Sequence, residues 1–256
     1  AMPSPPAVPR LFVVELGLVP YPEALARQRA VARARIAGAL AEDVLLLVEH
    51  PPVVTLGRST RAASLPIPVE LLGGRGVAVH EVERGGDVTV HAPGQLVGYP
   101  IVDLKRHRRD LHWYLRQVEA ALIDAVAPFG VRGGRHAGYT GVWTGDGDPD
   151  APGGPGWTPR RKLASIGVHA RDWVTWHGFA LNVTAEPLGY FDLIVPCGIA
   201  GVEMTAVARE AGRPVRVDEV ADAAARETAA VFGLTPVPLA PDALDAMLAE
   251  AAAPTA

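Results

Sequence analysis

Residues 162–183 read KLASIGVHARDWVTWHGFALNV, two runs of strand character around a short polar turn. Short runs rich in β-branched and aromatic residues, bounded by polar residues, are typical of paired strands. We therefore expect Lys162–Val168 and Trp173–Val183 to form a hairpin that turns near Ala170–Asp172. Gly178 inside the second run would weaken a strand unless another segment packs closely there.

Further strands and helices are indicated on both sides of this hairpin. Apolar residues at helical spacing after a potential N-cap, Asp110, predict a helix to about Phe129. Two more helices are expected at Tyr21–Leu40 and Val217–Phe232. Strands are expected at Leu11–Leu16, Val44–Glu49, Val53–Leu56, Val77–Glu83, Val88–His91 and Leu96–Asp103. Because strands and helices mix without strict alternation, the pattern predicts an α/β (α+β) fold, a single domain with a mixed sheet flanked by helices.

Composition suggests where this domain begins and ends. We expect a disordered segment at 1–9, a catalytic domain at 10–235 and a Pro/Ala-rich tail at 236–256, with a helix between Asp242 and Ala251. Gly145–Pro159 is rich in Gly, Pro and Asp, which predicts a mobile loop.

Charge and hydropathy exclude several classes of protein. The 256 residues carry a net charge of −4 with 49% hydrophobic residues, unlike a basic nucleic-acid binder. We see no apolar run of the roughly 18–20 residues that a membrane helix needs, and no signal-peptide pattern in Ala1–Pro9. One cysteine excludes an internal disulfide, so a reducing cytoplasm is the expected location. The histidines have no spacing typical of a zinc site, and we expect no metal.

Two rare residues are candidates for chemistry. Cys197 is the single cysteine and lies between Pro196 and Gly198, which define a sharp bend. Lys105 and Lys162 are the only lysines among 24 basic residues. Lysine can lose its proton when it is desolvated, whereas arginine stays charged. The local pattern leaves two alternatives open for each candidate: Cys197 is a nucleophile or a small buried apolar residue, and Lys162 is a titratable partner or a strand-end lysine reaching water.

Three glycine-containing segments could approach a ligand closely. They are Arg84, Gly85, Gly86, Asp87, Val88, Thr89, Val90 and His91; then Ser165, Ile166 and Gly167; then Gly178, Phe179 and Ala180. Adjacent glycines after a strand permit either an ordinary hairpin turn or a close approach of ligand to backbone. Gly178 and Ala180 could likewise form the floor of a groove for an apolar chain, or only a close contact between strands.

Taken in order, these segments resemble the lipoyl(octanoyl) transferase family. The matching motifs are Arg84-Gly85-Gly86, Thr89-Val90-His91-Ala92-Pro93-Gly94-Gln95, Lys162-Leu163-Ala164-Ser165-Ile166-Gly167-Val168, His177-Gly178-Phe179-Ala180-Leu181-Asn182-Val183 and Pro196-Cys197-Gly198. The resemblance covers about residues 10–233 and implies a fold similar to the catalytic domain of biotin and lipoate protein ligases. It implies that Cys197 forms a thioester acyl-enzyme, that Lys162 lowers the pKa of its thiol, and that the three glycine-containing segments bind the acyl chain.

The resemblance also implies a reaction and partners. Octanoyl-acyl carrier protein would be the donor, and no external cofactor is implied. The acceptor would be a specific lysine on lipoyl domains of 2-oxoacid dehydrogenase complexes or on glycine cleavage H protein. Two alternatives stay open: an amidotransferase that moves octanoyl groups between lipoyl domains, and an ATP-dependent lipoate or biotin ligase on the same fold. For the acidic carrier, Lys105-Arg106-His107-Arg108-Arg109 is the densest basic run and the expected docking site.

Overall fold

A computed structural model describes residues 9–148, 156–196 and 201–252. Its strands are β1 (Arg10–Leu18), β2 (Asp43–Glu49), β3 (Val53–Leu56), β4 (Ala78–Glu81), β5 (Val88–His91), β6 (Gln95–Ile101), β7 (Gly134–His136), β8 (Tyr139–Asp146), β9 (Thr158–Arg171), β10 (Val174–Asn182), β11 (Glu203–Met204) and β12 (Thr235–Pro238). Its α-helices are α1 (Tyr21–Ile36), α2 (Val69–Gly74), α3 (Leu111–Val126), α4 (Val207–Ala211), α5 (Val217–Val231) and α6 (Pro241–Ala252). Short 3-10 helices are η1 (Ala62–Ser64), η2 (Leu104–Arg106), η3 (Ala127–Phe129) and η4 (Glu186–Leu193).

Most of these strands form one mixed sheet. Across the described ranges it has nine strands in the order β12-β1-β2-β6-β10-β9-β8-β7, with β11 beside β9. β1 pairs in parallel with β2 and β12, whereas the pairs from β2 through β6, β10, β9 and β8 to β7 are antiparallel. A separate three-stranded sheet has the order β4-β3-β5. The mixed sheet confirms the expected fold class.

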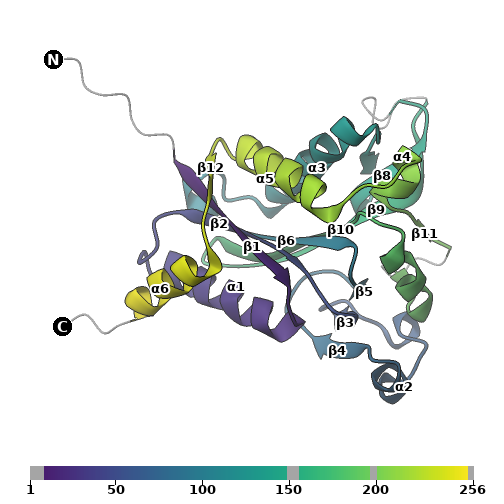
Figure 1. Cartoon of the computed structure of the whole chain (residues 1–256), viewed down its shortest axis with the longest axis horizontal. Helices are drawn as coiled ribbons and strands as arrows, with labels where there is room; N and C mark the ends of the chain where they lie inside the picture. Colours follow the sequence, from purple (N-terminus) through teal and green to yellow (C-terminus); the bar gives the residue numbers. More distant parts are fainter. Residues whose placement is uncertain (1–8, 149–155, 197–200, 253–256) are drawn as a thin grey trace.

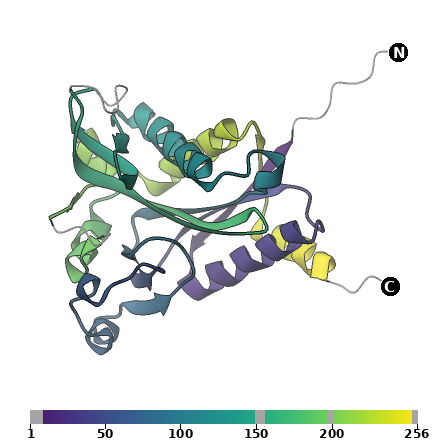
Figure 2. The same ribbon diagram turned by 180° about the vertical axis from the view of Figure 1, so that it is seen from behind.

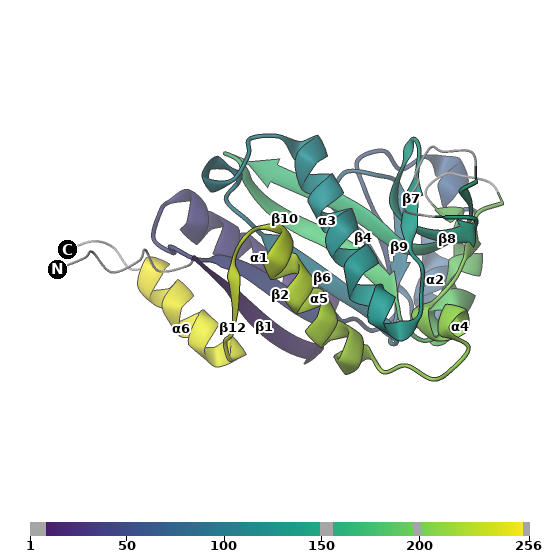
Figure 3. The ribbon, with the colours of Figure 1, turned by 90° about the horizontal axis from the view of Figure 1, so that it is seen from above.

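Helices cover both faces of the large sheet (Figure 1). α3 and α5 lie side by side on one face, as seen from above in Figure 3, while α1 and α6 lie on the other. The central strand β2 therefore has six buried positions in its seven residues, as expected for a strand covered on both faces. Within the described residues, no helix is long and apolar enough to cross a membrane.

Local chemistry explains two elements that the sequence predicts. The hairpin is confirmed as β9 and β10, and its turn lies at Asp172 and Trp173, whose φ angles of 50° and 65° match a two-residue hairpin turn. The helix after Asp110 is confirmed as α3. Asp110 is its N-cap, because its carboxylate accepts a hydrogen bond from the Trp113 N–H at 3.0 Å. That helix ends at Val126 and continues as one 3-10 turn to Phe129.

The Pro/Ala-rich segment at the end of the chain adds structure to the domain. The expected helix is present as α6, with Pro241 at its first position and Leu244 fully buried. β12 was not expected, yet Val237 pairs with Phe12 at the edge of the large sheet. Of the predicted mobile loop, residues 149–155 lie outside the described ranges.

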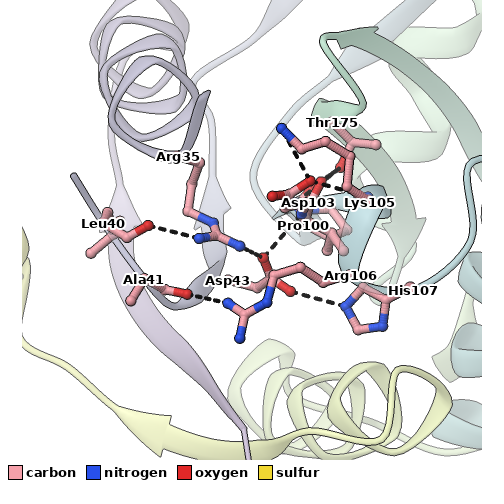
Figure 4. A network of polar contacts seen from close by, with 11 residues as sticks. Arg35, Leu40, Ala41, Asp43, Pro100, Asp103, Lys105, Arg106, His107 and Thr175 are labelled. Carbon is pink, nitrogen blue, oxygen red and sulfur yellow. Dashed lines mark hydrogen bonds and ion pairs between the residues drawn. The ribbon is translucent and has the colours of Figure 1, made fainter. Parts of the chain in front are cut away.

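A buried charge network joins α1, β2 and η2 (Figure 4). The Asp43 carboxylate accepts hydrogen bonds from Arg35 Nη2 at 2.5 Å and from the Asp103 N–H at 3.0 Å. His107 Nε2 lies 3.1 Å from the same carboxylate. Burial opposes ionisation of Asp43, but the hydrogen bond with His107 and the charge of Arg35 lower its pKa below the usual value.

Two residues of the basic run 105–109, the expected docking site for the carrier, make contacts within the fold. His107 contacts Asp43, and Arg106 Nη1 donates to the Ala41 carbonyl at 2.5 Å (Figure 4). Arg108 and Arg109 lie next to the start of α3. Lys105, Arg106, Arg108 and Arg109 are exposed, so the basic run stays on the surface apart from His107, and docking of the carrier there stays a prediction.

Candidate active site

A cavity of about 490 Å³ lies between the small sheet, β9, β10 and the start of α3. The small sheet lies on the α1 side of the large one (Figure 2). The cavity brings together three segments that are far apart in sequence, and the predicted residues lining it are Arg84, Gly85, Gly86, Asp87, Val88, Thr89, His91, Lys162, Ser165, Ile166, Gly167, Gly178, Phe179 and Ala180. Val90 is not among the lining residues, and its side chain lies in the apolar cluster with Val54 and Leu72.

Part of the cavity lies where β8 leaves β9. Pairing between these strands runs from Val142↔Ala164 to Asp146↔Thr158. Tyr139 and Thr140, which precede the paired part of β8, line the cavity together with Ser165–Val168 of β9. Separation of the two strands therefore provides one wall of the cavity, and α3 contributes Leu111, His112 and Leu115 to it.

Arg84 and Gly85 hold the glycine turn, Arg84 through Thr55 of β3 and Gly85 through Val168 of β9. Arg84 is 7% exposed, and its guanidinium donates from Nη2 to the Thr55 carbonyl at 2.8 Å. The next residue, Gly85, donates its N–H to the Val168 carbonyl at 2.8 Å. A Cβ at Gly167 would lie 2.7 Å from the Gly85 carbonyl oxygen, so glycine is required for this approach. The segment is thus a hairpin turn that also forms the cavity wall.

The close packing expected at Gly178 is also present. A Cβ there would collide with the Gly98 carbonyl oxygen and with Pro100 on β6. Gly98 in turn has no room for a Cβ because the Phe179 ring lies over it. The close strand contact at Gly178 is confirmed, and the residue also lines the cavity, while its role as the floor of a groove for an apolar chain stays a prediction.

Lys162 is buried at the wall of the cavity. It is 3% exposed, and its Nζ lies 5.3 Å from the centroid of the Trp143 ring. An ammonium over an indole face is stabilised by the ring quadrupole. The Lys162 carbonyl accepts the Thr205 N–H at 2.9 Å, and Met204 of β11 pairs with Lys162 in parallel. The alternative of a strand-end lysine reaching water is wrong for this residue.

Cys197 lies outside the described residues, but the chain on each side of it is anchored beside the cavity. Before it, the Val195 N–H donates to the Ser64 carbonyl at 2.9 Å, and Ser64 Oγ donates to the Asp87 carboxylate at 2.6 Å. After it, Met204 pairs with Lys162. Both anchors, Asp87 and Lys162, line the cavity.

Buried aromatic and imidazole rings form another part of the lining. His91 Nδ1 lies 2.7 Å from Gln95 Oε1, and the Tyr21 hydroxyl lies 3.4 Å from His177 Nδ1. Burial lowers the pKa of His91 and of His177 to about 3 and raises that of Tyr21 to about 12. These groups are therefore neutral near pH 7, and they add polarity to the cavity without adding charge.

The sequence pattern did not identify Tyr21, Tyr99, Leu111, His112 or Tyr139 as lining residues. They come from α1, β6, α3 and β8, and only the folded sheet brings them together. Across the described parts of the chain, no group of three His, Cys, Asp or Glu side chains is placed to hold a metal ion.

Comparison with known proteins is consistent with this geometry. Residues 20–229 match the family model described as the lipoyl protein ligase A/B catalytic domain. An octanoyltransferase of Gloeobacter violaceus is 45% identical over 94% of this chain and 97% of its own length. One of Geobacter sulfurreducens is 49% identical over 83% of this chain and 81% of its own.

Solved structures share the fold at low sequence identity. A bi-partite lipoate protein ligase of Thermoplasma acidophilum superposes with a TM-score of 0.68 at 14% identity, covering 94% of this chain and 91% of that one. A lipoate-protein ligase A bound with ATP gives a TM-score of 0.63 at 14% identity, covering 94% and 93%. On the family match and the identity to its relatives, the chain belongs to the lipoyl protein ligase A/B catalytic-domain family and, within it, to the octanoyltransferases.

Proposed function

We propose that this acyltransferase moves an octanoyl group from octanoyl-acyl carrier protein to the ε-amine of a lysine on a lipoyl domain, through a thioester on Cys197. The observation that supports the proposal is that both flanks of Cys197 are held beside one cavity: Val195 bonds to Ser64, which donates to the lining residue Asp87, and Met204 pairs with the lining residue Lys162. The acceptors would be lipoyl domains of 2-oxoacid dehydrogenase complexes and glycine cleavage H protein.

In the first half-reaction, the Cys197 thiolate attacks the thioester carbonyl of the donor. The tetrahedral intermediate collapses with cleavage of the bond to the carrier's sulfur, which leaves as a thiol after taking one proton. Lys162 is the group proposed to stabilise the attacking thiolate and to supply that proton. Splitting the transfer in this way replaces one difficult step with two easier ones.

In the second half-reaction, the neutral acceptor amine attacks the Cys197 thioester. An amide bond forms, the carbon–sulfur bond breaks, and the amine proton passes to Lys162, which restores its charge. No cofactor is needed for these steps. A cysteine that must cycle through the thiolate favours a reducing cytoplasm as the place of action.

The acyl chain is proposed to lie along Ser165–Gly167 and Gly178–Ala180, beneath the Arg84–His91 turn. Ile166 and Phe179 supply apolar surface there, and Gly167 and Gly178 permit the close backbone contacts that hold the walls together. Close packing of apolar walls on both sides is what an octanoyl chain requires in order to leave water.

Donor preference and ATP dependence test the proposal against its two alternatives. Purified protein would be given a lipoyl-domain acceptor with octanoyl-acyl carrier protein, with an octanoylated lipoyl domain, or with free octanoate and ATP. We expect rapid transfer from the carrier without ATP. Transfer that prefers the octanoylated domain would support the amidotransferase, and transfer that needs ATP would support the ligase.

A further inference from the structure

A buried carboxylate on α3 lies close to the part of β8 that packs beside the Lys162 side chain. Glu119 is fully buried and accepts hydrogen bonds from Arg116 Nη1 at 2.5 Å and from Arg135 Nε at 2.9 Å. Its second oxygen accepts the backbone N–H of Gly141 at 3.1 Å. The carboxylate is buried while the Arg116 and Arg135 side chains are 48% and 32% exposed, so Glu119 reaches from the surface arginines to the backbone of β8.

Gly141 is in direct contact with the lysine. A Cβ on this residue would lie 2.5 Å from the Ala164 carbonyl oxygen and 2.9 Å from Lys162 Cε. Its φ of +143° is in a region that favours glycine. The backbone of Gly141 therefore forms a wall against which the Lys162 side chain rests.

Gly141 also stands where β8 leaves β9. Strand pairing begins at the next residue, Val142↔Ala164. Glu119 supplies an acceptor for the Gly141 N–H at this point, and Arg116 and Arg135 hold the carboxylate on its other side. α3 is thus tied to β8 at the residue that touches Lys162.

We infer that Glu119 is a positioning residue, which acts through its hydrogen bond to the Gly141 backbone to hold the Lys162 side chain in the cavity wall. The inference rests on the proposed function, in which Lys162 acts on Cys197. Glu119 does not need to touch substrate in this role. What matters is the reach of its side chain, because it must bridge the two arginines and the Gly141 N–H at once.

Two substitutions test the connection from Glu119 through Gly141 to Lys162, one at Glu119 and one at Gly141. Glu119→Asp keeps the charge but is one methylene shorter, so the carboxylate loses reach to Gly141. Gly141→Ala leaves Glu119 intact and places a methyl group against Lys162 Cε. Asp43→Glu is the matched control, since it also changes a buried, doubly paired carboxylate by one methylene, and it lies in the network around Arg35 and His107.

The measurement is the pH dependence of Cys197 alkylation by iodoacetamide, with the melting temperature and the kcat and KM for the donor. A Lys162→Met variant gives the midpoint expected when the lysine is removed. We expect Glu119→Asp and Gly141→Ala each to raise the midpoint by about one pH unit, towards that of Lys162→Met. We also expect kcat to fall at least about ten-fold with little change in KM, as for a misplaced group. Asp43→Glu should lower the melting temperature and leave the midpoint unchanged.

The outcomes separate this inference from the proposed function. If Lys162→Met leaves the midpoint of Cys197 alkylation unchanged, the proposed action of Lys162 on Cys197 is contradicted. A midpoint that moves in Lys162→Met and Gly141→Ala but not in Glu119→Asp would overturn the role of Glu119 alone. Loss of stability in Glu119→Asp with a wild-type midpoint would show that the carboxylate is merely structural, which also contradicts the inference.

Discussion

The backbone N–H of Gly85 donates to the carbonyl of Val168 at 2.8 Å, and this bond joins the small sheet to β9 at the cavity. Gly167 lies beside the bond, with no room for a Cβ against the Gly85 carbonyl or the Arg84 side chain. The cavity therefore depends on close contact of two backbones that belong to different sheets.

Substitution at this contact should impair acyl binding. We expect Gly167→Ala to push the Arg84–Gly85 turn away from β9, at a cost of about 1–3 kcal/mol in the free energy of unfolding. The donor KM should rise because the acyl-binding wall moves. Gly189→Ala is the control, since a Cβ added at that position would meet no atom of a non-neighbouring residue within 4 Å. Equal kinetics in the two variants would show that the turn does not shape the acyl site.

Lys162 has two roles in the proposed cycle, and substitution by arginine separates them. Arginine supplies a positive charge but cannot readily give up a proton at working pH. We expect Lys162→Arg to retain measurable acyl-enzyme formation and to lose turnover to the acceptor by about 10²–10⁴-fold. Lys162→Met and Lys162→Ala control for the bulk of arginine. Near-normal turnover in Lys162→Arg would reject proton transfer and leave only the electrostatic role.

The sequence predicted the elements whose signals are local. The β9–β10 hairpin and the start of α3 follow from a polar turn and from Asp110, which are short-range features. The lining residues Tyr21 and Tyr99 could not be predicted, because they reach the cavity through the packing of α1 and the order of the sheet. The contacts of Glu119 could not be predicted from the sequence either, because its partners Arg135 and Gly141 lie 16 and 22 residues away.

The basic run shows what a charge pattern leaves open, because four of its residues are exposed while His107 packs against Asp43. Five consecutive residues, 105–109, carry basic side chains, but η2 turns two of them, Arg106 and His107, towards β2 (Figure 4). A linear sequence does not show which side of the chain each residue faces in an irregular segment.

The Asp43 network should stabilise the fold in a pH-dependent way. Its folded-state pKa is lowered, so its contribution is present above the unfolded value near 4 and is lost as the pH falls through the folded pKa. We expect Asp43→Asn to cost about 3 kcal/mol in the free energy of unfolding at pH 7, because Arg35 loses its buried partner. Denaturant titrations should show a smaller difference from wild type at pH 3. A difference that is independent of pH would contradict the ionised state of Asp43.

Carrier docking is now expected at the start of α3, beside the cavity. Arg109 precedes the helix, and His112 lines the cavity. We expect Arg109→Glu with His112→Glu to slow acylation by the acidic carrier and to weaken its dependence on salt. Acylation by octanoyl-coenzyme A, which lacks the carrier, should change much less. Arg33→Glu, an exposed position on α1, is the control, and equal slowing by it would indicate a general charge effect.

The central claim is that Cys197 carries the octanoyl group, and intact-protein mass spectrometry tests it directly. The protein is mixed with octanoyl-acyl carrier protein in the absence of acceptor, and Cys197→Ala is treated in parallel. The account predicts the mass of one octanoyl group on the wild-type chain, located at Cys197, removed by hydroxylamine and discharged on addition of a lipoyl domain. Transfer to the lipoyl domain that proceeds in the Cys197→Ala variant, or without any adduct on the wild-type chain, would contradict it.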